Sequence, residues 1–144
     1  MQAKTKSKWG SVIILTLVMT LIVSSVAAAK PMLASPVIGE VLINEFVAAN
    51  GTVQTSEWVE LFNTTTQTLD IGGMYIDDIA GGGGAAKVIP SGTTIAAGGF
   101  YVMTFSSFLN NTGDDVRLLG NDGTTVHDTY TYSTATADKS WCRS

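Results

Sequence analysis

The sequence predicts an all-β domain, either a sandwich or a barrel, behind an N-terminal export segment. From Ile38 onward no stretch has the apolar spacing of three and four residues that marks a helix. The chain instead has runs of four to eight β-branched and aromatic residues, separated by Gly, Asn and Asp. Short strands at such close spacing are typical of β-sandwiches and β-barrels.

Eight strands are predicted, and the first two form a hairpin against which the others are laid. The predicted strands are residues 40–47, 58–63, 68–71, 74–76, 87–89, 100–105, 116–119 and 125–132. In the last of them Val126, Tyr130 and Tyr132 share one face, because side chains alternate along a strand. We expect that face to point into the core and the threonine-rich face to point to solvent.

Residues 1–29 have the features of a signal peptide helix. Lys4, Lys6 and Lys8 precede an apolar run over residues 12–23, and small alanines end the segment at Ala29. The run is shorter than the roughly 20 residues that a membrane span needs. Cleavage after Ala29 is therefore expected, and an uncleaved membrane anchor is the alternative. Residues 30–37 are predicted to be a flexible mature N-terminus, and residues 38–144 the folded domain.

Charge and cysteine content exclude several classes of function. The chain from residue 30 onward keeps five of the eight basic residues and all twelve acids, so its net charge is −7. Such a domain repels phosphate backbones, and we expect no direct binding of nucleic acid. The lone Cys142 cannot form an internal disulfide, so the core has to be sufficient without one.

A catalytic site is not expected, because the candidate residues lack partners. His127 is the one histidine, and its sequence neighbour Asp128 lies on the opposite face of the predicted strand. Cys142 follows in what looks like a loose C-terminal stretch without a positioned base. We interpret the two as a surface histidine and a thiol that is either inert or adventitiously reactive. One histidine and one cysteine also cannot supply a usual zinc site.

Calcium is the one metal whose preferred ligands occur in the predicted loops. Oxygen ligands come in three groups, and none has the regular spacing of a calcium-binding loop. They are Asp77 with Asp78, Asp114 with Asp115, and Asn121 with Asp122. Turn formation and solvation explain these acids more simply, so no metal site is predicted.

The acids of the opening hairpin are the remaining candidates for chemistry. Glu45 and Glu60 lie in paired strands, where facing like charges would need a cation or a hydrogen-bond donor between them. Trp58 and Phe62 share a face with Glu60, as a carboxylate hydrolase would require of its substrate-binding aromatics. Asn44 and Asn63, however, suggest side-chain hydrogen bonds that fix local geometry. A scaffold role is therefore predicted, and Glu60→Gln is expected to change stability more than any activity.

An ordered set of motifs resembles the lamin tail domain family. The segments that resemble the opening strands of that family are Val41-Leu42-Ile43-Asn44-Glu45-Phe46, Trp58-Val59-Glu60-Leu61-Phe62-Asn63 and Leu69-Asp70-Ile71-Gly72-Gly73-Met74-Tyr75-Ile76. Residues 89–102, 116–119 and 122–124 continue the resemblance. The resemblance spans about residues 38–143. Its signature residues here are Ile43, Asn44, Glu45, Trp58, Glu60, Leu61, Asn63, Gly73, Pro90, Gly92, Gly99 and Gly123.

The resemblance implies an immunoglobulin-like β-sandwich without a cofactor and without catalytic activity. It also implies a type of module that occurs in prokaryotes on exported or surface proteins. We therefore expect a secreted or cell-surface module that binds a protein or a cell-envelope polymer, or that has a structural role. The alternative is an accessory domain at the N-terminus of a secreted hydrolase, such as a nuclease or a phosphoesterase. Relatives usually continue past a segment like Ser140–Arg143, so a final edge strand or a further domain is expected to be missing here.

Overall fold

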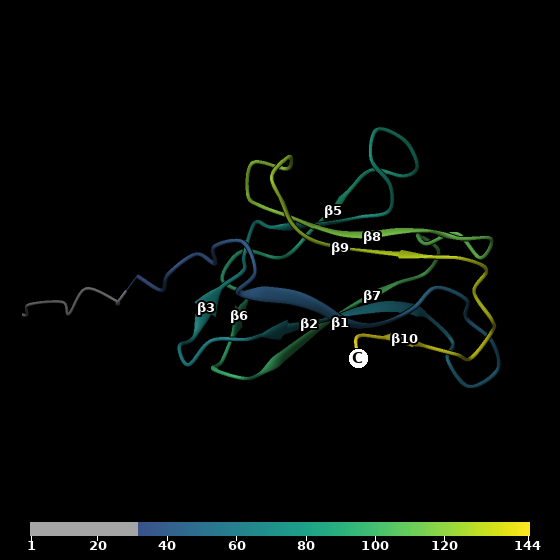
Figure 1. Ribbon diagram of the computed structural model, residues 1–144, viewed down its shortest axis with the longest axis horizontal. Helices are drawn as coiled ribbons and strands as arrows, with labels where there is room; N and C mark the ends of the chain where they lie inside the picture. Colours follow the sequence, from purple (N-terminus) through teal and green to yellow (C-terminus); the bar gives the residue numbers. More distant parts are fainter. Residues whose placement is uncertain (1–31) are drawn as a thin grey trace, which may run out of the picture. The chain divides into compact units, whose positions relative to one another are not determined.

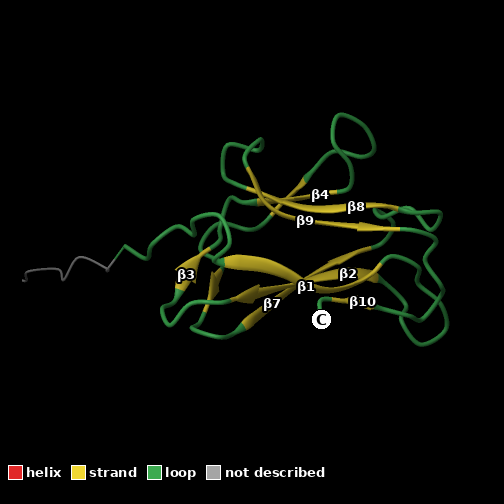
Figure 2. Cartoon of the chain, in the orientation of Figure 1, coloured by secondary structure: helices red, strands yellow, loops and turns green. Residues whose placement is uncertain are grey.

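The computed structural model describes residues 32–144, in which every regular element is a β-strand (Figures 1 and 2). The strands are β1 (Val41–Val47), β2 (Glu57–Asn63), β3 (Leu69–Asp70), β4 (Tyr75–Asp77), β5 (Lys87–Val88), β6 (Thr94–Ile95), β7 (Phe100–Phe105), β8 (Asp114–Leu119), β9 (Val126–Tyr132) and β10 (Trp141–Cys142). The all-β prediction is confirmed for this part of the chain. The predicted signal peptide helix lies outside the described residues.

Two antiparallel sheets of four strands face each other across the core (Figure 1). The first sheet has the strand order β10-β1-β2-β7, and the second has the order β5-β4-β8-β9. A small sheet of β3 and β6 completes the fold. This arrangement of sheet on sheet is the predicted sandwich.

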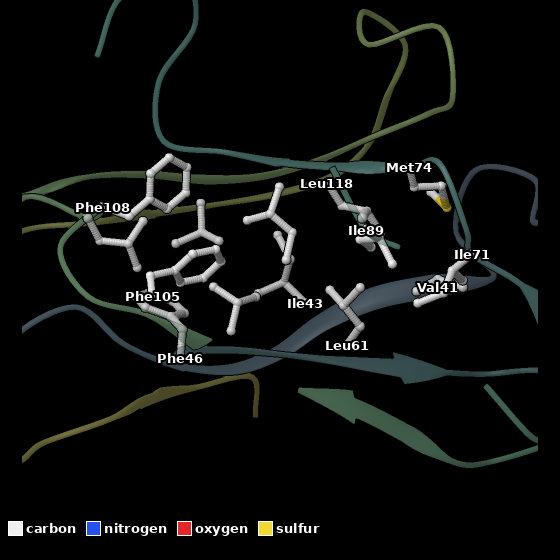
Figure 3. Packing of buried hydrophobic residues seen from close by; sticks show 14 of the residues in the cluster. Val41, Ile43, Phe46, Leu61, Ile71, Met74, Ile89, Phe105, Phe108 and Leu118 are labelled. Atoms are coloured by element: carbon white, nitrogen blue, oxygen red, sulfur yellow. The ribbon is translucent and has the colours of Figure 1, made fainter. Parts of the chain in front are cut away.

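The core forms because alternate residues of the long strands point between the sheets. In β2, Glu57, Val59, Leu61 and Asn63 are buried while the residues between them are half-buried. Figure 3 shows Val41, Ile43, Phe46 and Leu61 of the first sheet opposite Leu118 of the second. Phe46 is completely buried, and its ring lies 5.1 Å from that of Tyr132 and 5.3 Å from that of Tyr130. These aromatic contacts across the sandwich fix how β9 lies over β1.

Two strands were absent from the sequence-based prediction. β6 and β10 have two residues each, which is too short to show any alternation of apolar and polar side chains. β6 pairs with β3, and β10 pairs with β1 through Glu45 with Cys142 and Phe46 with Trp141. The prediction of a loose stretch around Cys142 was therefore wrong, because a distant partner strand orders it.

The predicted core face of β9 is correct for its tyrosines but wrong for Val126. The register shifts where Leu118 pairs with Asp128 and Leu119 pairs with Val126, which leaves His127 as an extra residue in β9. Such a bulge interrupts the alternation of side chains. Val126 is 38% exposed as a result, while Tyr132 is buried and Tyr130 is half-buried.

Residues 31–144 form one compact unit with its own hydrophobic core, which is the requirement for independent folding. The flexibility of segment 30–37 stays a prediction, although Ala34 within it makes a parallel bridge to Leu69 and its carbonyl accepts a hydrogen bond from the Asp70 amide. No helix within residues 32–144 has the length and apolar character needed to cross a membrane.

Candidate functional site

The solvent-facing side of the sheet β10-β1-β2-β7, here called the outer face, carries the hairpin residues Glu45, Glu60, Trp58 and Phe62 that the sequence analysis weighed as candidates for chemistry. Antiparallel register places one row of side chains across all four strands, from Cys142 through Glu45 and Glu60 to Val102. A second row contains Leu42, Phe62 and Phe100, and a third contains Val47, Trp58 and Thr104. Carboxylates therefore occupy the middle of the face, with aromatic rings on both sides.

A β-bulge at Asn44 explains how two glutamates can be neighbours. Ile43 pairs with Leu61 but Glu45 pairs with Glu60, so Asn44 is the extra residue. Its Nδ2 donates a hydrogen bond of 2.7 Å to Oε1 of Glu60. The amide is the donor that facing carboxylates require, and the predicted geometric role of Asn44 is thereby explained.

Aromatic side chains form the part of the outer face nearest to β7. The rings of Phe62 and Phe100 stack with centroids 4.9 Å apart and planes at 29°. Phe100 is 56% exposed and Val102 is 46% exposed. Trp58 is half-buried, and its Nε1 donates to Oε1 of Gln54 at 3.1 Å, which holds the indole ring in place. The rings offer apolar contact area to solvent.

Asp128 and Arg143 connect the two sheets, a role that sequence analysis missed for both. Oδ2 of Asp128 accepts hydrogen bonds from the Ile43 amide at 2.7 Å and from an Arg143 guanidinium nitrogen at 2.6 Å. Nε of Arg143 donates to the Ile43 carbonyl at 3.1 Å, and its amide donates to the Asn44 carbonyl. The pair satisfies the backbone groups that the bulge in β1 removes from regular pairing. The sequence does contain one signal of this role, because Asp128 lies on the predicted core face of β9, where an acid needs a partner.

Asn63 has a structural position at the end of β2. It is completely buried, and Nδ2 donates to the carbonyls of Gln67, Ile95 and Ala96 at 2.7 to 3.0 Å. Its Oδ1 accepts from the amide and the hydroxyl of Thr65. One side chain thus ties β2 to the turn that follows it and to β6, as the predicted hydrogen-bonding role requires.

The other signature residues lie in the core or in turns. Ile43 and Leu61 are core residues. Gly73 and Gly92 have φ values of +87° and +80°, a region that side chains disfavour, and the Gly73 amide donates to the Ile89 carbonyl. The carbonyl of Pro90 accepts from the amide and the hydroxyl of Thr93. The turn residues Gly99 and Gly123 lie before β7 and between β8 and β9.

His127 is half-buried, so the prediction of a surface histidine was incomplete. It borders a cavity of about 180 Å³ whose other lining residues are Ser35, Pro36, Met74, Gly120 and Asn121. Its Nδ1 is buried and has no hydrogen-bond partner within the described part of the chain. The Asp128 carboxylate accepts from the Ile43 amide and from Arg143, and it makes no hydrogen bond to the imidazole Nδ1. His127 therefore lacks the orienting group that a general base needs.

The acids considered for calcium all have partners within the protein. Asp77 forms an ion pair of 2.6 Å with Arg117, and Asp78 accepts from the amides of Ile79 and Gly84. Asp114 accepts from the Asn110 side chain and Asp115 from the Thr131 hydroxyl. Across residues 32–144 no three His, Cys, Asp or Glu side chains are grouped in a way that would hold a metal ion.

Asp122 closes the turn between β8 and β9. Its carboxylate accepts from the hydroxyl and the amide of Thr125 and from the amide of Thr124. These bonds, the Thr125 hydroxyl first among them, hold the pKa of Asp122 well below its ordinary range. A carboxylate engaged in this way stabilises the turn, which is the role predicted for it.

The phenol of Tyr132, whose pKa is raised, lies between the sheets near the loop from β7 to β8. Burial raises the pKa of Tyr132, and the nearby carboxylates of Asp114 and Glu57 raise it further. The Tyr132 hydroxyl donates to the Asn110 carbonyl at 2.8 Å, and Glu57 accepts from the amides of Phe108 and Leu109. These groups hold the loop.

The candidate catalytic residues are not brought together in the described part of the chain. Hydrolysis needs a nucleophile and an oriented base within reach of each other, and neither His127 nor Cys142 belongs to such a pair among the described residues. Cys142 is exposed in β10 and pairs in register with Glu45. The outer face instead provides a stacked ring pair beside a row of carboxylates.

Comparison with known proteins assigns the family. No curated protein matches the chain. The family model described as Lamin Tail Domain matches residues 34–134, which is more than half of the chain and contains β1 to β9. The chain therefore belongs to the lamin tail domain family, a family of immunoglobulin-like β-domains that are not typically catalytic.

Proposed function

We propose that this chain is an exported, non-catalytic module that binds a protein or a cell-envelope polymer through its outer face. The observation that carries the proposal is the stacked pair of Phe62 and Phe100 beside Val102, with Phe100 56% exposed and Val102 46% exposed. Aromatic rings held in fixed positions provide large contact areas at little cost in conformational entropy. Surfaces of this kind commonly supply the dominant contacts of an interface.

Local charge supports a ligand that is not a nucleic acid. Glu45 and Glu60 lie in the middle of the outer face, and the predicted mature chain has a net charge of −7. A phosphate backbone would approach these carboxylates at a Coulombic cost. Neutral or basic polymers and peptides meet no such cost, and Glu60 offers its second oxygen as an acceptor, since Oε1 is bound to Asn44.

Export of the chain is proposed from the signal-peptide features of residues 1–29. If that segment is cleaved, the domain is secreted. If it is retained as an anchor, the domain is displayed on the cell surface. An exported domain of this kind folds without a disulfide, since Cys142 has no cysteine partner in the sequence.

The test uses residues 30–144 and insoluble cell-envelope material from the producing organism. The domain is expected to co-sediment with the envelope material at micromolar concentration. Replacing both Phe62 and Phe100 with Ala should weaken retention at least tenfold, because a dominant interface ring typically contributes about 2 kcal/mol. Val88→Ser, at a residue of the other sheet that is 51% exposed, serves as the matched control and should retain binding.

Circular dichroism should show that the double variant is folded. Equal retention of the double variant and the wild type would exclude the outer face as the binding surface. No retention of the wild type on envelope material or on secreted protein fractions would leave a passive structural role for the domain.

A further inference from the structure

Strand β7 forms an open edge of the first sheet. Within the described strands it pairs with β2 alone, on one side. The edge strands β5 and β10 have two residues each, and β9 carries a bulge together with His127 and Asp128. β7 has six residues, pairs with β2 over its whole length without a register shift, and contains no charged residue or proline.

The backbone groups on the free side of β7 can be assigned from the pairing on its other side. The Asn63 amide donates to the Gly99 carbonyl at 3.0 Å, which makes these two residues a hydrogen-bonded pair. Because such pairs alternate in an antiparallel ladder, Tyr101 and Met103 also bond to β2. The amides and carbonyls of Phe100, Val102 and Thr104 therefore point away from β2, toward solvent.

Natural proteins usually protect an edge of this length. Lysine, proline, a bulge or a covering loop are the common means, since an unpaired strand accepts another strand. β7 has none of these features in its sequence or register, and both Phe100 and Val102 remain about half exposed. The edge is thus available for pairing.

We propose that two copies of this chain associate through their β7 strands as an antiparallel, two-fold symmetric pair. The outer faces of the two copies lie on the same side of the joined sheet only if each pair of opposing residues has two even numbers or two odd numbers. The register centred on Val102 satisfies this condition, with Val102 opposite Val102 and Phe100 opposite Thr104 of the other copy. The two sheets then join into one continuous sheet of eight strands.

The free edge of β7 is complementary to itself, which favours a second copy of the chain as its partner. In this register Tyr101 lies opposite Met103 on the inner side, and both residues are half-buried in the single chain and pack at the margin of the core. Each copy supplies the same outward amides and carbonyls at the same spacing. Apolar side chains thus meet on both faces of the new seam, and every backbone group finds a partner.

Charge permits this contact despite the acidity of the chain. The carboxylate nearest the seam on the outer face is Glu60, which pairs in register with Val102. Three strand spacings separate the two copies of Glu60, or about 14 Å. That separation exceeds the Debye length of about 8 Å at physiological salt, so repulsion between the copies is largely screened.

The first test measures the mass of residues 30–144 by sedimentation velocity over a range of concentration. The wild type is expected to reach twice the mass of one chain at micromolar concentration. Val102→Lys should shift the domain to a single-chain mass, because it puts two like charges opposite each other on the symmetry axis. Val88→Lys, the same change on the edge strand β5, should leave the dimer intact.

The second test fixes the register by disulfide trapping in a Cys142→Ser background. A hydrogen-bonded antiparallel pair has Cα atoms about 5.5 Å apart, which lies within the range for disulfides. Val102→Cys should therefore cross-link to itself under mild oxidation. Thr104→Cys alone should not, whereas Thr104→Cys with Phe100→Cys should.

A single-chain mass for the wild type up to millimolar concentration would overturn the proposal. A dimer that survives Val102→Lys and lacks the Val102→Cys cross-link would also overturn it, since another surface would then hold the copies together. The proposal does not depend on the ligand of the outer face, because mass and cross-linking are measured on the purified domain without envelope material.

Discussion

The two sides of the first sheet differ in how their strands are held. On the side of β1 and β10, a bulge at Asn44 is bound by Asp128 and Arg143, and Phe46 packs between the tyrosines of β9. On the side of β2 and β7, the pairing is regular, and it ends at β7, which contains no charged residue and has no further neighbour among the described strands. The first side is closed by contacts across the sandwich, and the second is open to solvent.

This difference indicates that stability and binding are assigned to different parts of one sheet. Charged and buried groups on the closed side have partners that a substitution would remove, so changes there should unfold the domain. The apolar residues Phe100 and Val102 on the outer face of the open side are exposed, so changes there should alter association and leave the fold. Paired substitutions of the same type on the two sides test the comparison directly.

The largest effect is expected from removing an aromatic ring on each side. Phe46→Ala should lower the free energy of unfolding by about 3–5 kcal/mol, because it leaves a cavity between β1 and the rings of β9. Phe100→Ala should cost about 1 kcal/mol or less, because that ring is already 56% exposed. Urea unfolding followed by tryptophan fluorescence measures both. Similar losses for the two variants would contradict the comparison.

A smaller effect is expected from breaking the contact between Asp128 and Arg143. Asp128→Ala should cost about 2–3 kcal/mol, since it leaves the Ile43 amide without its acceptor and the guanidinium without its carboxylate. The cost stays below that of a fully buried pair because the Arg143 side chain is 38% exposed. Asp115→Ala is the control, and its bond to the exposed Thr131 hydroxyl predicts a change of about 0.5 kcal/mol. A loss for Asp128→Ala no larger than that of the control would show that the sheets do not need this link.

The smallest effect concerns Asp138, which precedes β10 and binds the loop between β1 and β2. Its carboxylate accepts from the amides of Gln54, Val53 and Thr52, and the Gln54 bond contributes most to holding the pKa of Asp138 below its ordinary value. A lowered pKa stabilises the fold above the unfolded value of about 3.9, and this contribution is lost as the pH falls below it.

Asp138→Asn should therefore lower the melting temperature at neutral pH, and the gap to the wild type should narrow below about pH 4. Asn is a suitable replacement because it tolerates the left-handed backbone of this residue, whose φ is +62°. Melting temperatures followed by circular dichroism between neutral and acidic pH measure the gap. A gap of constant size across this range would argue against a role for the charge.

Regular strands could be predicted from the sequence because their side chains alternate. Phe100–Phe105 was predicted with its observed bounds, and β1, β2 and β9 were predicted to within one residue at each end. Glu45 and Glu60 were placed in paired strands, and side-chain hydrogen bonds were expected of Asn44, but their direct pairing and the bond from Asn44 to Glu60 come from the structure. The bulges at Asn44 and His127 were not predicted, since an extra residue leaves no mark on the apolar pattern.

The sequence by itself determined the all-β class, the long strands and the family, because alternation, turn residues and ordered motifs are local properties of the chain. Only the tertiary structure decided that Asp128 and Arg143 join the sheets and that Trp141–Cys142 closes one edge while β7 stays open at the other. These features depend on strands that are distant in sequence but adjacent in space. Whether an edge is covered is a property of the assembled sheet, and no local pattern encodes it.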